Sequence, residues 1–190
     1  MRLTAVCLAL ALSLAASAAS AARPVHDDGL MATFKTVCLD TRGDAPSVME
    51  LVEADGWKPS PAAQATGVRA YVKTVGPRRW ELILKDASNP ADRAIPFPTR
   101  RNTCAITLTP DTVDARAALR GYMGVDPSET NGAASGWIYT EEGATRDDIK
   151  DPPPNFAREA VDRGPLVIIQ VTPRGDGNVM VFTRIAKIEP

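Results

Sequence analysis

Two cysteines, Cys38 and Cys104, are the residues of this chain whose chemistry is easiest to assign. They follow an N-terminal stretch typical of an export signal, and an exported protein enters an oxidising compartment. Cys7 lies within that signal and leaves with it, so two cysteines remain. If they pair, the disulfide closes a long loop and stabilises the fold by roughly 4 kcal/mol. Two buried free thiols are the alternative that the sequence leaves open.

Nucleophilic and metal chemistry have little support in the sequence. His26 is the only histidine, and it lies in a short polar stretch where a catalytic triad or Cys–His pair would be poorly held. No G-x-S-x-G elbow is present. His26-Asp27-Asp28 offers one imidazole and two adjacent carboxylates, which do not make a closed metal site. We therefore predict no catalytic residue, no cofactor and no metal ligand.

Paired acids could cleave glycosidic bonds, a reaction that needs two carboxyl groups, one of them with a raised pKa. The pairs are Asp27-Asp28, Glu141-Glu142 and Asp147-Asp148. All of them lie in polar stretches, so we interpret them as solvated surface. Asp176, between two glycines, lacks the rest of a calcium-loop pattern and is interpreted as part of a turn.

Aromatic and basic side chains provide the one candidate binding surface. Trp57 and Trp80 could line a ligand groove, and Arg78 and Arg79 would lie at a hairpin tip. Exposed arginines can meet an acidic partner or a lipid head group. Core packing remains the favoured role of the tryptophans, Trp137 included, because each one follows or opens a regular element.

The first 22 residues predict a signal peptide. Arg2 is followed by an apolar run from Ala5 to Leu14 and then by small residues up to Ala22. The run is too short for a membrane span, which needs about 20 apolar residues, and no later segment is apolar enough. The expected location is therefore periplasmic or secreted. Residues 23–33 would form a flexible arm, and residues 34–190 would form a single globular domain.

The charge balance argues against nucleic acid as a partner. The net charge is -1 at pH 7, and no basic block of the kind that follows a phosphate backbone occurs. The partners that remain are an envelope protein or a small ligand.

Residues 34–39 are a candidate first strand or an extended lead-in. A helix should follow, because Asp44 or Ser47 can cap its start, apolar positions then recur at helical spacing, and Gly56 is a natural stop.

The second helix is expected to start at Thr109-Pro110-Asp111, where a capping threonine precedes a proline. It would end at Gly121 or Gly124. A strand over residues 104–109 should precede this helix, and a short strand over residues 137–140 should follow it.

Two hairpins are predicted. Residues 68–75 and 80–85 flank a Gly-Pro-Arg-Arg turn, and residues 166–172 and 178–185 flank a Pro-Arg-Gly-Asp-Gly turn. Both arms of the C-terminal hairpin are almost continuously apolar. This pattern predicts strands that are central in the sheet or covered on both faces.

Two long connections complete the chain. Residues 87–101 hold three prolines and should form a loop. Residues 141–164 are polar and should form a surface connection, with a helical turn near residues 157–161.

Together these elements predict an α+β fold, with an antiparallel sheet and two principal helices on one face. Each cysteine precedes a capped helix, a glycine, a tryptophan and a hairpin. The domain could therefore consist of two strand–helix–hairpin halves that the disulfide joins at equivalent points. An ordinary α+β chain without duplication is the alternative.

The spacing Phe34-x3-Cys38, the pair Gly56-Trp57 and then Cys104 resemble a pattern of small, uncharacterised exported proteins of proteobacteria. The resemblance covers the first half of the mature chain closely and the rest loosely. It implies a periplasmic location and carries no catalytic motif.

Three functional hypotheses follow. The first is a non-enzymatic binding or accessory module of the cell envelope, because no catalytic constellation is present. The second is an envelope hydrolase whose carboxylates and arginines converge only in three dimensions, which would require a pocket with two or more buried ionisable groups. The third is a protein–protein inhibitor with an exposed rigid loop over residues 143–154.

Overall fold

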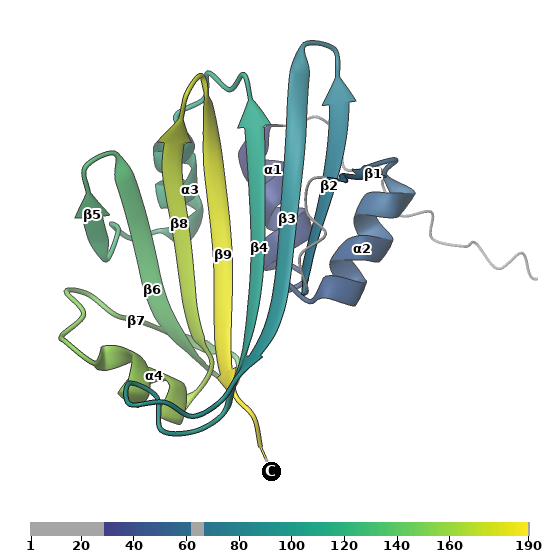
Figure 1. Cartoon of the computed structure of the whole chain (residues 1–190). Helices are drawn as coiled ribbons and strands as arrows, with labels where there is room; N and C mark the ends of the chain where they lie inside the picture. Colours follow the sequence, from purple (N-terminus) through teal and green to yellow (C-terminus); the bar gives the residue numbers. More distant parts are fainter. Residues whose placement is uncertain (1–28, 62–66, 190) are drawn as a thin grey trace, which may run out of the picture.

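A nine-stranded antiparallel sheet dominates the computed structural model, which describes residues 29–61 and 67–189 (Figure 1). The strand order is β1-β2-β3-β4-β9-β8-β6-β5, and β7 pairs with β6. The strands are β1 (Lys58–Pro59), β2 (Val68–Val75), β3 (Arg78–Asn89), β4 (Thr99–Thr109), β5 (Glu129–Asn131), β6 (Ala134–Glu142), β7 (Thr145–Asp148), β8 (Leu166–Arg174) and β9 (Gly177–Lys187). The expected α+β fold with an antiparallel sheet is confirmed. The predicted signal peptide and His26 lie outside the described residues.

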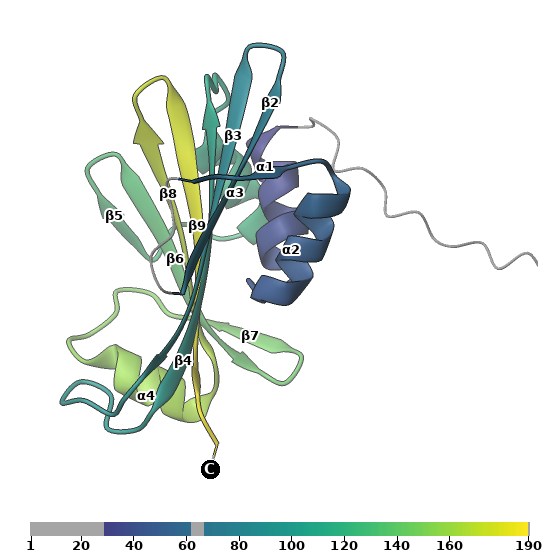
Figure 2. The ribbon, with the colours of Figure 1, turned by 45° about the vertical axis from the view of Figure 1, so that its right-hand side comes forward.

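The helices lie on both faces of the sheet (Figures 1 and 2). One face carries α1 (Leu30–Phe34), which continues as the π-helix η1 (Lys35–Leu39), together with α2 (Ala45–Ala54) and α3 (Ala115–Met123). The other face carries α4 (Phe156–Arg163), which covers only the lower end of the sheet. No helix among the described residues is long and apolar enough to cross a membrane.

The main core lies between the sheet and the first group of helices. Alternate residues of the central strands point into it, and Leu82, Ile106 and Phe182 are almost fully buried. A second, smaller cluster forms under α4, where Val161 packs against the lower ends of β6, β8 and β9. The central strands are therefore covered on both faces at their lower ends only.

The predicted disulfide is confirmed. Cys38 of η1 bonds to Cys104 of β4, 66 positions later, and neither side chain is exposed. The Cα atoms are 5.6 Å apart, within the usual range for a disulfide. The bond connects the helical layer to the middle of the sheet.

The predicted strand over residues 34–39 is wrong, because this segment is helical from Leu30 to Leu39. Phe34, Val37 and Cys38 are fully buried, and this spacing of three and four is the period of a helix face. The segment is too short and too apolar for periodicity to separate the two structures. The predicted flexible arm also ends earlier than expected, since Leu30 is already buried in α1.

Each half of the sheet is built from helix followed by strands. The first half contributes β2, β3 and β4, the second contributes β6, β8 and β9, and the last strands of the two halves, β4 and β9, pair at the centre. The predicted order of strand, helix and hairpin therefore needs correction, since helix comes first. The disulfide also joins a helix to a strand within the first half, so the cysteines are not equivalent points.

The sequence predicts the start of α2 correctly and the start of α3 wrongly. Of the two predicted caps, Asp44 is the one that caps α2, and its carboxylate accepts from the Ser47 backbone N–H. α3 does not start at Thr109-Pro110, because β4 continues through Thr109. The cap is Asp114, which accepts from the Ala117 N–H, and Gly124 ends the helix in a left-handed conformation.

Both predicted hairpins are confirmed, as β2–β3 and β8–β9. β9 is central in the sheet, between β4 and β8. The predicted loop over residues 87–101 is shorter than expected, because β3 continues to Asn89 and β4 begins at Thr99. The predicted connection after residue 141 contains α4 near the expected helical turn, and also β7, which the sequence did not indicate.

Replacing the α2 cap tests this local structure and its dependence on pH. Hydrogen bonds from the Ser47 hydroxyl and backbone N–H lower the pKa of the Asp44 carboxyl below its ordinary 3.8. The cap therefore stabilises fully above pH 3.8 and is lost as the pH falls through the lowered pKa. We expect Asp44→Ala to cost about 1 kcal/mol near neutral pH in urea denaturation.

Two variants control this experiment. Asp44→Asn caps a helix without titrating, so it should keep most of the stability at neutral pH and remove the acid-dependent loss. Glu50→Ala, on the exposed side of α2, should change the free energy of unfolding by less than about 0.5 kcal/mol. An Asp44→Ala variant as stable as Glu50→Ala would contradict the role of the cap.

Candidate functional site

One side of helix α3 is buried in the core, and another side lines a cleft. Leu119 and Met123 point into the core. Arg116 and Arg120, four positions apart, lie on another side of the helix, where the small residues Ala117 and Gly121 leave room for a ligand.

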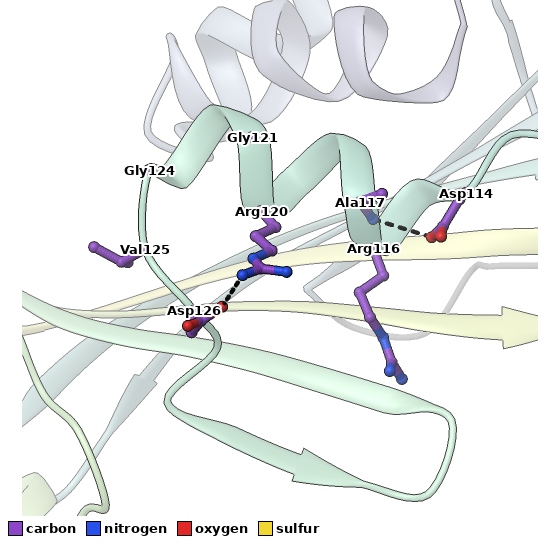
Figure 3. Close-up of a pocket in the computed structure, with 8 residues that line it drawn as sticks. All are labelled: Asp114, Arg116, Ala117, Arg120, Gly121, Gly124, Val125 and Asp126. Atoms are coloured by element: carbon purple, nitrogen blue, oxygen red, sulfur yellow. Dashed lines mark hydrogen bonds and ion pairs between the residues drawn. The ribbon is translucent and has the colours of Figure 1, made fainter.

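The cleft lies between α3 and the segment that leads to the β5–β6 hairpin (Figure 3). Its volume is about 620 Å³. We call it the α3 cleft, and it is lined by Asp114, Arg116, Ala117, Arg120, Gly121, Gly124, Val125 and Asp126. A hollow of about 230 Å³ on the other side of Arg116 shares Asp114 and Arg116 with it and reaches Asn178 of β9.

The two arginines span the α3 cleft in different ways. Arg116 donates from Nη2 to the backbone oxygen of Ala133 at 2.7 Å, which holds the β5–β6 hairpin beside the helix. Arg120 pairs through Nη2 with Asp126 Oδ1, also at 2.7 Å (Figure 3). Arg116 therefore helps to build the cleft, whereas Arg120 and Asp126 hold opposite charges at its edge.

The Arg120–Asp126 pair is weak enough to open. Their side chains are 63% and 69% exposed, and exposed ion pairs contribute roughly 0–1 kcal/mol. A ligand carboxylate could take the place of Asp126 and accept two parallel hydrogen bonds from the guanidinium. Asp126 would then be free to accept from a cationic group of the same ligand.

A second pocket, of about 250 Å³, lies between η1, the end of α3 and the β6–β7 hairpin. The guanidinium of Arg146 lies 4.8 Å from the ring centre of Tyr139 and pairs with Asp148. Glu141 accepts from Arg184 Nε at 3.1 Å. Arg146 and Glu141 of this pocket therefore already have partners within the chain.

Burial raises the pKa of the Tyr139 phenol to about 12, and the nearby Glu141 carboxylate acts in the same direction. The phenol stays protonated at physiological pH, where it can donate a hydrogen bond but cannot act as a base.

The structure does not bring together the residues of the binding surface that the sequence suggested. Trp57 and Trp80 are only 3% and 2% exposed and meet edge to face in the core, with ring centroids 6.3 Å apart. The Trp57 indole donates to Asp55, which also pairs with Lys73. No indole face remains for a ligand, so the tryptophan part of that prediction is wrong. The favoured alternative, core packing, is confirmed, and Trp137 is buried as well.

The arginines of that predicted surface lie at the tip of the β2–β3 hairpin. Arg79 is exposed and pairs with Glu81 of the same strand, whereas Arg78 is half-buried. Because Trp57 and Trp80 are buried, they do not form one surface with Arg78 and Arg79. The hairpin tip also lies outside the α3 cleft.

Three of the paired acids among the described residues form ion pairs, and one of them is Glu141 with Arg184. Asp147 pairs with Arg163 and Asp148 with Arg146. Asp176 lies in the turn between β8 and β9, as expected. Across residues 29–61 and 67–189 no three histidine, cysteine or acidic side chains gather as they would around a metal ion. Asp27-Asp28 lies outside this part of the chain.

Arg116, Arg120 and Asp126 were not predicted as site residues from the sequence. The spacing of the two arginines places them on one side of a helix, and this signal was available. Asp126 and the β5–β6 hairpin lie beside α3 because the chain turns back after Gly124, and the spacing of residues in the sequence does not predict this path. Comparisons of the chain with protein-family models, with curated proteins and with solved structures found no match.

Proposed function

We propose that this protein is an exported, non-enzymatic binding module of the cell envelope that takes a small zwitterionic ligand in the α3 cleft. The export pattern of the first 22 residues and the Cys38–Cys104 disulfide support the location. The exposed Arg120–Asp126 pair at the edge of a cleft supports the binding role and carries the proposal.

The ligand class follows from the exchange of ion pairs. Binding replaces Arg120–Asp126 with an Arg120–carboxylate pair and an Asp126–ammonium pair, so no charge is left without a partner. Free amino acids and short peptides carry both groups. The cleft volume of about 620 Å³ fits this size, since ligand pockets are commonly about 300–1,000 Å³. Asp114 stays committed to the helix cap.

Calorimetric titration of the mature protein with a panel of amino acids and di- and tripeptides tests this proposal. We expect at least one of them to bind, and Arg120→Gln to weaken that binding about tenfold or more through loss of a charged hydrogen bond. N-acetylated and amidated forms of the same ligand should also bind more weakly, because each lacks one of the two charges.

Arg163→Gln is the matched control. Arg163 is 51% exposed and pairs with Asp147 on the other side of the sheet, so its removal changes the net charge equally but leaves the cleft intact. Equal losses in the two variants would mean that binding depends on overall charge. Failure of every zwitterion to bind would overturn the proposal.

A further inference from the structure

The pocket of about 250 Å³ between η1, the end of α3 and the β6–β7 hairpin is a second candidate binding site. We call it the Tyr139 pocket. Leu39, Tyr139 and Phe182 line it and are buried or half-buried, so they form its apolar base. Arg42 and Tyr122 line it as well and are exposed, which places them at its rim. The pocket therefore combines aromatic rings with a cationic side chain.

The pocket holds a positive charge without a partner in the described chain. Of its three charged side chains, Arg146 pairs with Asp148 and Glu141 pairs with Arg184. The third is Arg42, whose side chain forms no hydrogen bond or ion pair with any residue that the structure describes. Its guanidinium is therefore available to an anionic ligand.

The backbone holds Arg42 in place over the pocket. Its φ is 55°, in the left-handed region that residues other than Gly, Asn and Asp seldom adopt. The Arg42 N–H donates to the backbone oxygen of Leu39 at 3.0 Å, and the Gly43 N–H donates to that of Cys38 at 2.9 Å. Cys38 is bonded in turn to Cys104. Uncommon backbone conformations of this kind concentrate at ligand sites, and a fixed backbone lowers the entropy that is lost on binding.

Tyr139 adds a hydrogen-bond donor. Its hydroxyl bonds to no residue of the described chain, and its raised pKa keeps the proton in place at neutral pH. The Arg146 guanidinium lies over the ring, and Asp148 holds that guanidinium by accepting from its Nε at 2.6 Å. The phenol is therefore fixed in position and can donate to a ligand.

We propose that the Tyr139 pocket binds a small aromatic carboxylate. The ligand carboxylate pairs with Arg42 and accepts from the Tyr139 hydroxyl, since both groups line the same small pocket. The ligand ring packs against Leu39 and Phe182 and is bordered by Tyr122. The inference does not depend on the ligand of the α3 cleft.

The charge balance favours a carboxylate over a phosphate. Arg42 can neutralise one negative charge, whereas Glu141 lines the same pocket and is itself negative. A second negative charge on the ligand would lie unpaired near a carboxylate in a partly buried site, which is unfavourable.

The volume and the lining favour a single ring. An apolar cavity of about 150 Å³ can hold benzene, so about 250 Å³ has room for one ring and its carboxylate. Rings gain from offset or edge contacts with other rings in addition to their burial. Tyr122 is 46% exposed, and a ring beside it would remove apolar surface from water.

NMR titration of the oxidised mature protein with benzoate and phenylacetate tests the proposal. We expect saturable shifts of the Arg42, Gly43 and Tyr139 amide signals, and a dissociation constant of about 1 mM or lower for at least one of the two ligands. Acetate lacks the ring and benzamide lacks the charge. Each should therefore bind at least about tenfold more weakly.

Substitution of the two polar contacts locates the site. Arg42→Gln should weaken binding at least about tenfold, and Tyr139→Phe about three- to tenfold, because each removes a hydrogen bond to a charged group. Arg174→Gln is the matched control. Arg174 is exposed like Arg42, pairs with no described residue, and lies at the end of β8 that turns into β9, outside the pocket. Circular dichroism melting should show that all three variants fold.

The pattern of shifts separates this pocket from the α3 cleft. Shifts at Arg116 and Ala117 without any at Arg42 would place the ligand in the cleft and overturn the proposal. Acetate or benzamide that binds as tightly as benzoate would overturn the ligand class. An Arg42→Gln variant that binds as well as Arg174→Gln would exclude the proposed ion pair. The absence of saturable shifts with both aromatic carboxylates at about 10 mM would overturn the site altogether.

Discussion

Removal of the Cys38–Cys104 disulfide is expected to lower the free energy of unfolding by up to about 4 kcal/mol, because the bond closes a loop of 66 positions. Cys104→Ala is the cleanest variant, since both sulfur atoms are buried and a serine would add a polar group to the core. Equilibrium urea denaturation of oxidised wild type and variant measures the difference.

Two controls isolate the bond from the side chains. Wild-type protein reduced with dithiothreitol should lose nearly the same stability as Cys104→Ala. The Cys38→Ala/Cys104→Ala double variant should cost little more than either single change, because each single change already removes the whole bond. Additive losses would mean that the cysteines act through packing. A loss below about 1 kcal/mol would contradict the loop-closure argument.

The disulfide lies where the chain after η1 packs closely against the sheet. Gly43, in the turn after η1, lies against the Phe182 ring, and a Cβ atom there would be 3.1 Å from the ring and 3.6 Å from Cys104 Cβ. Its φ of 64° also favours glycine. The chain therefore passes close over the middle of the sheet next to the disulfide.

Local signals account for the parts of the fold that the sequence predicts correctly. Asp44 and Gly56 mark the ends of α2 through capping, and glycine-containing turns mark the β2–β3 and β8–β9 hairpins. Each of these signals acts within a few residues. The disulfide is a long-range contact, but the expected compartment and the number of cysteines were enough to predict it.

The errors arise where distant contacts decide the structure. Thr109-Pro110 looks like a helix start, yet β4 continues through Thr109 because it pairs with β3. β7 is polar and lies at the surface, and its pairing with β6 alone makes it a strand. The α3 cleft depends in the same way on Asp126 and on the Arg116 bond to the β5–β6 hairpin.

The apolar pattern of the C-terminal hairpin predicted strands that are central in the sheet or covered on both faces. The first of these alternatives is confirmed, since β8 and β9 lie between β4 and β6 in the sheet.

A second large loss of stability is expected from a substitution in α1 and η1, the segment that is helical where a strand was predicted. Phe34 is fully buried, and we expect Phe34→Ala to cost about 3–5 kcal/mol through lost apolar burial and the cavity left behind. Thermal and urea unfolding measure this loss. Lys35→Ala, at the exposed neighbouring position, is the control and should change stability by less than about 0.5 kcal/mol.

Two further substitutions separate a helix from an extended strand at this site. In a helix Val37 shares the buried face of Phe34 and Cys38, whereas in a strand Thr36 would take that place. The structure buries Val37 fully and leaves Thr36 half-exposed. We therefore expect Val37→Ala to cost about 1.5–3 kcal/mol and Thr36→Ala clearly less. The reverse order would mean that this segment is extended in solution and that the helical layer above the disulfide is different.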